Sequence, residues 1–100
     1  MKTSRIKKKS HSELLSLMNV GNATLKDLQL LGIEKIEHLK NQTPDNLYEK
    51  LQYLTGVKQD PCVWDVFAAI IHEAQTGEKL PWWHWSTIRK TTGRSLPKFQ

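Results

Sequence analysis

Residues 17–25 read LMNVGNATL, and this stretch decides the fold. Asn19 and Gly21 tolerate positive φ better than most residues, and they flank the apolar Val20. Apolar residues at helical spacing lie on both sides, so the stretch predicts a helix, a tight turn and a second helix. Such a turn brings backbone N–H groups to the surface at a helix N-terminus, where unpaired donors and the helix dipole favour a phosphate.

Upstream of this turn, Ser10 and Glu13 have the spacing of a capping box, so we expect the first helix to begin there. Its predicted buried side consists of Leu14, Leu15, Leu17 and Met18.

Downstream, start and stop signals alternate along the chain. The second helix ends at Gly32, and a short third helix follows over residues 33–39. Thr43-Pro44 and Asp60-Pro61 are caps followed by proline at the first helical position, and Gly56 and Gly77 end the two helices that they begin. The sequence therefore predicts an all-α domain of about five short helices with no strand.

The regular pattern stops at Leu80. Residues 81–85 read PWWHW and predict an extended aromatic segment that leads into a polar, basic tail. We expect Trp82, Trp83 and Trp85 to pack on the helical body, with base stacking as the weaker alternative. The predicted organisation is a basic flexible arm at 1–9, a helical domain at 10–80, and a Trp-rich segment with a basic tail at 81–100.

Charge is uneven along the chain, whose formal net charge is +5. The two ends hold nine cations and no acid: Lys2, Arg5, Lys7, Lys8, Lys9, Arg89, Lys90, Arg94 and Lys98. The body between them is net acidic and should by itself repel a polyanion. An anionic partner is therefore expected to meet the ends of the chain and the turn at residues 19–24.

The turn resembles the helix-hairpin-helix motif, in which an apolar residue lies between two glycines ahead of a helix. Gly21 matches the second glycine and Thr24 the hydroxyl of the next turn, whereas Asn19 replaces the first glycine. Residues 54–62, LTGVKQDPC, resemble a second, degenerate copy. There Asp60 adds a negative charge and Pro61 lacks an N–H where phosphate would bind, so we expect this copy to be structural.

The order of these segments is similar to a small bacterial family of pathogenicity-locus or mitomycin-resistance-like helix-hairpin-helix proteins. The resemblance rests on the hairpin, on Leu30-Leu31-Gly32-Ile33, on residues 55–62, on Asp65-Val66-Phe67 and on the aromatic segment, and it covers roughly residues 12–90. It implies a tandem, SAM-like helical domain. It does not imply a reaction or a ligand.

These patterns predict a non-catalytic protein that binds the nucleic-acid backbone, DNA in the first place, without sequence specificity. The predicted contacts are the hairpin residues Asn19, Gly21, Asn22, Ala23, Thr24 and Lys26, together with the basic arm Lys2, Arg5, Lys7, Lys8 and Lys9. The alternative is a protein-interaction module, with a homodimer as one form of it, that uses an exposed apolar or Trp-rich surface and has no nucleic-acid role.

We expect no catalytic activity, and we expect no metal or other cofactor. Cys62, His72 and His84, even with His38 added, match no compact zinc pattern. Asp60, Asp65 and Glu73 are interpreted as a cap and a solvated face. One cysteine fits a reducing compartment, and we expect a cytoplasmic protein without a membrane span.

Overall fold

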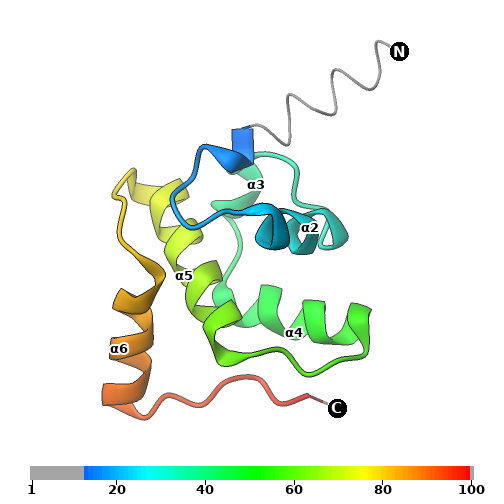
Figure 1. The fold of residues 1–100 in the computed structure, drawn as a ribbon, viewed down its shortest axis with the longest axis vertical. Coiled ribbons are helices and arrows are strands. Elements are labelled where there is room, and N and C mark those ends of the chain that lie inside the picture. The colour runs from blue at the N-terminus through cyan, green and yellow to red at the C-terminus, as the bar shows by residue number, and fades with distance from the viewer. Residues whose placement is uncertain (1–12, 100) are drawn as a thin grey trace.

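The computed structural model describes residues 13–99, and this part of the chain is all-helical, with no strand. Helical residues 13–15 precede α2 (Asn22–Leu30), α3 (Ile36–Leu39), α4 (Pro44–Thr55), α5 (Pro61–Thr76) and α6 (Trp82–Thr92). Figure 1 shows α2 and α3 in the upper part of the molecule, α4 directly below α2, and α5 running between the two parts. The predicted all-α fold is confirmed.

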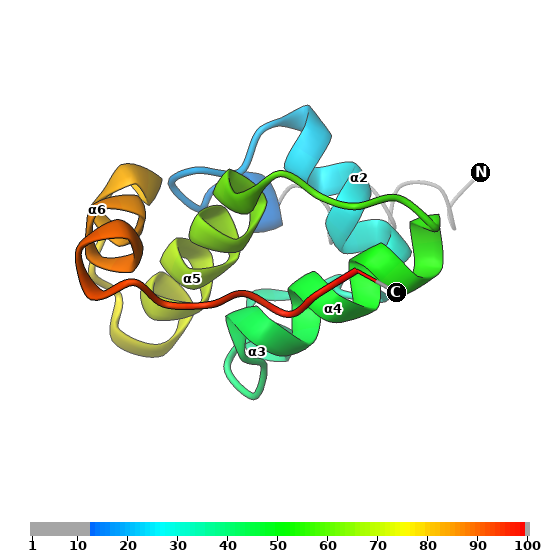
Figure 2. The same ribbon diagram turned by 90° about the horizontal axis from the view of Figure 1, so that it is seen from below.

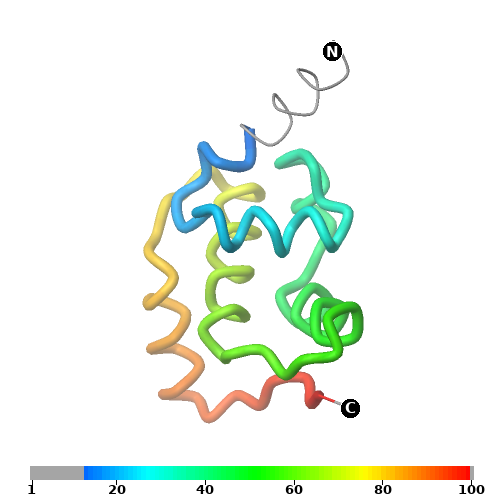
Figure 3. Tube along the Cα trace, turned by 45° about the vertical axis from the view of Figure 1, so that its right-hand side comes forward, coloured from blue at the N-terminus to red at the C-terminus, as the bar shows by residue number. Residues whose placement is uncertain are grey.

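Helix α5 is the centre of the domain and contacts α3, α4 and α6. Its buried side chains lie on nearly all sides of the helix, as expected for a helix covered by its neighbours. They are Trp64, Asp65, Phe67, Ala68, Ala69, Ile70, Ile71, Glu73 and Ala74. Figure 3 shows α5 and α6 running side by side.

The start and stop signals of α4 and α5 are confirmed. The Thr43 hydroxyl accepts a hydrogen bond from the Asn46 amide at 3.1 Å, and the Asp60 carboxylate accepts one from the Cys62 amide at the same distance. Gly56 and Gly77 follow the two helices with φ of +67° and +80°, the left-handed conformation in which a side chain is strained.

The predicted beginning of the first helix is only partly described, because Ser10 lies outside residues 13–99. The Glu13 carboxylate accepts a hydrogen bond from the Ile36 amide at 2.9 Å, so it caps α3. Leu14 and Leu17 are buried as predicted, whereas Leu15 and Met18 are more than one-third exposed.

The prediction of an extended aromatic segment after Leu80 was wrong, because residues 82–92 form α6. A helix turns about 100° per residue, so Trp83 and Trp85 point about 160° apart and cannot both face the body. Trp85 packs against the core, while Trp82 and Trp83 are 38% and 60% exposed. Only one of the three therefore packs as expected.

A single ion pair joins α6 to α5. The Arg89 guanidinium donates to both carboxylate oxygens of Asp65 at 2.9 Å, and Asp65 is fully buried. The interpretation of Asp65 and Glu73 as members of a solvated face was therefore wrong. Their cationic partners, Arg89 and Lys79, lie beyond the predicted end of α5, where sequence spacing gave no reason to place them.

The segment after α6, residues 93–99, runs back across α5 and α4, as Figure 2 shows from below. Arg94 pairs with Asp45 at 2.6 Å and lies over the Trp64 ring at 5.1 Å. Pro97 accepts a hydrogen bond from the buried Gln52 side chain. Two of the four cations assigned to a basic tail, Arg89 and Arg94, are thus paired with acids of the body.

Candidate functional site

The first hairpin consists of residues 16–21 and the first turn of α2. Asn19 has φ of +79°, and among the described residues it is the one non-glycine residue with positive φ. Gly21 has φ of −106° and ψ of −170°, an extended conformation that any residue adopts. Gly21 therefore does not use the positive φ that glycine tolerates, and the strained position of the turn is Asn19.

The N-terminus of α2 is open. Its N-cap is Gly21, which provides no side-chain hydrogen bond, and the first turn contains no acidic residue. A Cβ placed on Gly21 would meet no atom within 4 Å, so the space above this backbone is empty. The first amides of a helix have no intrahelical acceptor, so they are available to an external one.

The side chain of Asn19 is used inside the molecule. Its Nδ2 donates to the Leu80 carbonyl at 2.9 Å, and its Oδ1 accepts from the Trp82 amide at 3.0 Å. Asn19 thus caps the N-terminus of α6, which Pro81 cannot cap itself. Figures 1 and 3 show the loop of residues 16–21 beside the start of α6.

Glu73 of α5 also holds this loop in place. Its Oε1 accepts a hydrogen bond from the Met18 amide at 2.9 Å, and its Oε2 accepts one from Lys79 Nζ at 2.8 Å. Both carboxylate oxygens are therefore engaged, and the negative charge of this buried group is matched by a lysine. These contacts fix the turn to α5 and to the residues that lead into α6.

The remaining predicted hairpin contacts follow Gly21 along α2. Asn22, Ala23 and Lys26 are exposed and Thr24 is half-buried. The structure therefore brings the predicted residues 19–26 together around one open helix end, with the side chain of Asn19 turned to α6. The predicted basic arm, Lys2, Arg5, Lys7, Lys8 and Lys9, lies outside the described residues.

The second hairpin has a closed helix end. Asp60 caps α5, and Pro61 occupies the first helical position. The hydrogen bond from the Cys62 amide lowers the pKa of Asp60 below its usual value, so a carboxylate stands at this N-terminus at neutral pH. Tyr48 donates to the Gln59 carbonyl and Gln52 accepts from the Gln59 amide, which makes the loop part of the α4–α5 packing.

Sequence reasoning missed the residues that hold the first hairpin, namely Glu73, Leu80 and Trp82. The one signal was Asn19 itself, because a side chain with both a donor and an acceptor replaces the glycine of the motif. Nothing in the spacing indicates where its partners lie.

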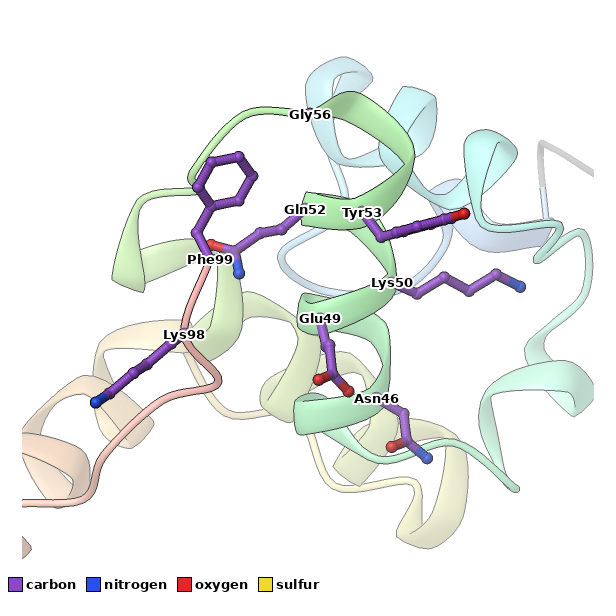
Figure 4. Close-up of a pocket in the computed structure, with 8 residues that line it drawn as sticks. All are labelled: Asn46, Glu49, Lys50, Gln52, Tyr53, Gly56, Lys98 and Phe99. Atoms are coloured by element: carbon purple, nitrogen blue, oxygen red, sulfur yellow. The ribbon is translucent and has the colours of Figure 1, made fainter.

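A shallow depression lies between α4 and the C-terminal residues. Figure 4 shows its lining side chains: Asn46, Glu49, Lys50, Gln52, Tyr53, Gly56, Lys98 and Phe99. Tyr53 and Lys50 extend away from Phe99 and Lys98, so the polar groups do not converge on a common point. We assign no ligand to this depression.

Cys62 and His72 do not form a nucleophile and base. They lie ten residues apart on α5, about 15 Å along the helix axis. His72 Nε2 contacts the Glu78 carboxylate at 2.7 Å, and burial raises the pKa of the Cys62 thiol, which disfavours the thiolate. Within residues 13–99, no group of three or more His, Cys, Asp or Glu is placed to hold a metal ion.

Comparison with known proteins identifies the family. Residues 7–91 match the model of the pathogenicity locus family, Cdd1. The chain belongs to this family. It is 33% identical over 79 residues to the mitomycin resistance protein McrB of Streptomyces lavendulae, covering 79% of this chain and 75% of that protein. No solved structure matches, and none of the described helices is long and apolar enough to cross a membrane.

Proposed function

We propose that the protein binds the nucleic-acid backbone, DNA in the first place, without sequence specificity or catalysis, and that residues 17–25 act as a helix-hairpin-helix motif. The observation that carries the proposal is the open end of α2. Its N-cap is a glycine without a capping side chain, the space above it is empty, and its first turn has no acid.

A phosphate fits this end for two reasons. Unpaired amides donate hydrogen bonds to its oxygens, and the helix dipole favours negative charge within the first turn. Lys26 is exposed one turn along the same helix. Because contacts of this kind reach only phosphates, they carry no sequence information.

The charge distribution supports an anionic partner of modest affinity. The chain is net positive, but its cations are concentrated at the two ends. With a net-acidic body, the dissociation constant should be about 10⁻⁴ to 10⁻⁶ M at physiological salt, the usual range of nonspecific binding. A reducing, cytoplasmic setting belongs to the same proposal, since Cys62 has no second cysteine to pair with.

The test is a titration of a fluorescently labelled duplex at low salt with the wild-type protein and Gly21→Asp. The extended backbone and open space at Gly21 accept aspartate, which also caps helices well. The variant should therefore fold normally and bind at least about tenfold more weakly, because its carboxylate occupies the phosphate position and repels the ligand.

The matched control is Asn46→Asp, which changes the net charge equally at an exposed position of another helix, α4. It should bind nearly as well as the wild type. Equal losses of affinity in the two variants would show that net charge alone causes the effect. No binding by the wild-type protein would overturn the proposal.

A second candidate function is contact with another protein or with a second copy of the chain. It is favoured by Tyr53, Leu54 and Val57, which are all at least 45% exposed at the end of α4 and in the following loop. Sedimentation over a range of protein concentrations tests it. A dimer that Tyr53→Lys dissociates would support this function, and a monomer at all concentrations would contradict it.

A further inference from the structure

Helix α6 presents two partly exposed tryptophans that the core does not use. Trp83 is 60% exposed and Trp82 38%, whereas Trp85 packs on α5 between His72 and His84 with ring centroids about 5 Å apart. Tryptophan has the largest apolar surface of any side chain, and exposed aromatic side chains are typical of binding surfaces.

This aromatic pair is joined to the first hairpin. The Trp82 amide bonds to Asn19 Oδ1 at 3.0 Å, and Asn19 Nδ2 bonds to Leu80 at 2.9 Å. The start of α6 is therefore held at a fixed position beside the turn that leads into α2. The open end of α2 begins three residues after Asn19, so only this short stretch of chain separates it from the residue that holds the start of α6.

The charge of the exposed face of α6 around Trp83 is also suited to a polyanion. From Lys79 to Phe99 the chain contains no Asp or Glu. Lys90 is exposed and lies seven residues after Trp83, which places it on the same side of the helix about 10 Å along the axis. In the part of the chain that the structure describes, no acidic side chain pairs with Lys90, unlike Arg89 and Arg94.

An exposed aromatic ring with an unpaired cation two turns away on the same side of the helix suits unpaired bases, with a base stacked on the ring and a phosphate near the cation. A regular duplex cannot use the ring, because its bases are already stacked on one another. We infer that the nucleic acid bound at the hairpin contains unpaired bases, and that one of them stacks on Trp83 while Lys90 contacts the adjoining backbone. The inference rests on the proposed function and names its substrate class.

The experiment compares three labelled probes at low salt: a single-stranded oligothymidylate, an abasic strand of equal length, and a duplex. Trp83→Ala should weaken binding of the oligothymidylate by about 5- to 150-fold, the range that removal of a base-stacking aromatic gives, and leave the abasic strand and the duplex unaffected. Trp83→Phe should retain most of the affinity. Phe99→Ala, which removes a 40% exposed aromatic ring from the C-terminal segment, is the matched control and should have no effect.

The outcomes separate the inference from the proposed function. Duplex binding that Gly21→Asp abolishes, with oligothymidylate binding indifferent to Trp83→Ala, overturns the stacking inference and leaves the function standing. No binding of any probe by the wild-type protein overturns both. A wild-type dimer that Trp83→Ala dissociates assigns the face to a second copy of the chain and also overturns the inference.

Discussion

The two hairpins of this protein have similar sequences, but the N-termini of the helices that follow them differ: one is open and the other is capped. In the first, glycine caps α2, no acid lies in the first turn, and the space above the N-cap is empty. In the second, aspartate caps α5, proline follows, and Gln52 and Tyr48 bind the loop into the core. The difference shows that a hairpin motif supplies a turn, whereas the residue at the N-cap decides whether the following amides are capped within the fold or left open.

The largest expected effect comes from breaking the buried ion pair that holds α6 against α5. Arg89→Met leaves the fully buried carboxylate of Asp65 without its cation, which should cost about 3–5 kcal/mol of unfolding free energy. Urea denaturation followed by circular dichroism measures it. Arg94→Met is the control on the side of the second hairpin, where a half-exposed pair should cost at most about 1 kcal/mol. Equal losses of unfolding free energy in the two variants would contradict the prediction that the buried ion pair between α5 and α6 contributes more to stability than the half-exposed pair.

The next largest effect is expected from substitutions at the two N-cap residues. Asp60→Ala removes the cap of α5 and should lower stability by about 1 kcal/mol, yet leave nucleic-acid affinity unchanged, because Pro61 has no N–H to offer. Gly21→Asp should do the reverse, with a slight gain in stability and at least about a tenfold loss of affinity. Thermal unfolding and duplex titration of both variants check this opposition. If Asp60→Ala also alters binding, the second hairpin is not merely structural.

Removal of residues 1–9 sharpens the comparison at the first hairpin. It deletes five cations, so affinity for a duplex should decline, and the slope of log affinity against log salt should become shallower by up to about 0.9 for each lost phosphate contact. Titrations at several salt concentrations measure the slope. An unchanged slope would mean that these cations take no part in binding and that the hairpin alone supports it.

The smallest effect concerns the segment that runs past the second hairpin. Burial alone raises the pKa of Asp45, but the hydrogen bonds from Arg94 and Trp64 and the charge of Arg94 together lower it below its usual value of 3.8. The resulting stabilisation is complete above pH 3.8 and is lost as the pH falls below it through the folded-state pKa. Because the pair is half-exposed, the loss should stay below about 1 kcal/mol.

Acid titration of the unfolding free energy, with Asp45→Asn beside the wild type, tests this prediction. The variant should lose less stability than the wild type between neutral pH and pH 3. Parallel curves would show that the Arg94 contact contributes nothing to stability.

The sequence by itself determined the helical class and four of the described helices, because their signals are local. A cap followed by proline begins α4 and α5, and a left-handed glycine ends each of them. The apolar stripe of α5 likewise identified Trp64, Phe67, Ala68 and Ile71 as core residues. The turn at residues 19–21 was also evident, although its positive φ belongs to Asn19 and not to Gly21.

Only the tertiary structure decided α6 and the surroundings of the first hairpin. Proline offers no capping side chain, so the start of α6 depends on Asn19, more than 60 residues away, and on the docking of Arg89 against Asp65. The packing of these distant segments also buries Glu73 and leaves Trp83 exposed to solvent. A capping signal is local and can be seen in a few residues, whereas a hydrogen bond or ion pair between distant segments exists only once the chain has brought them together.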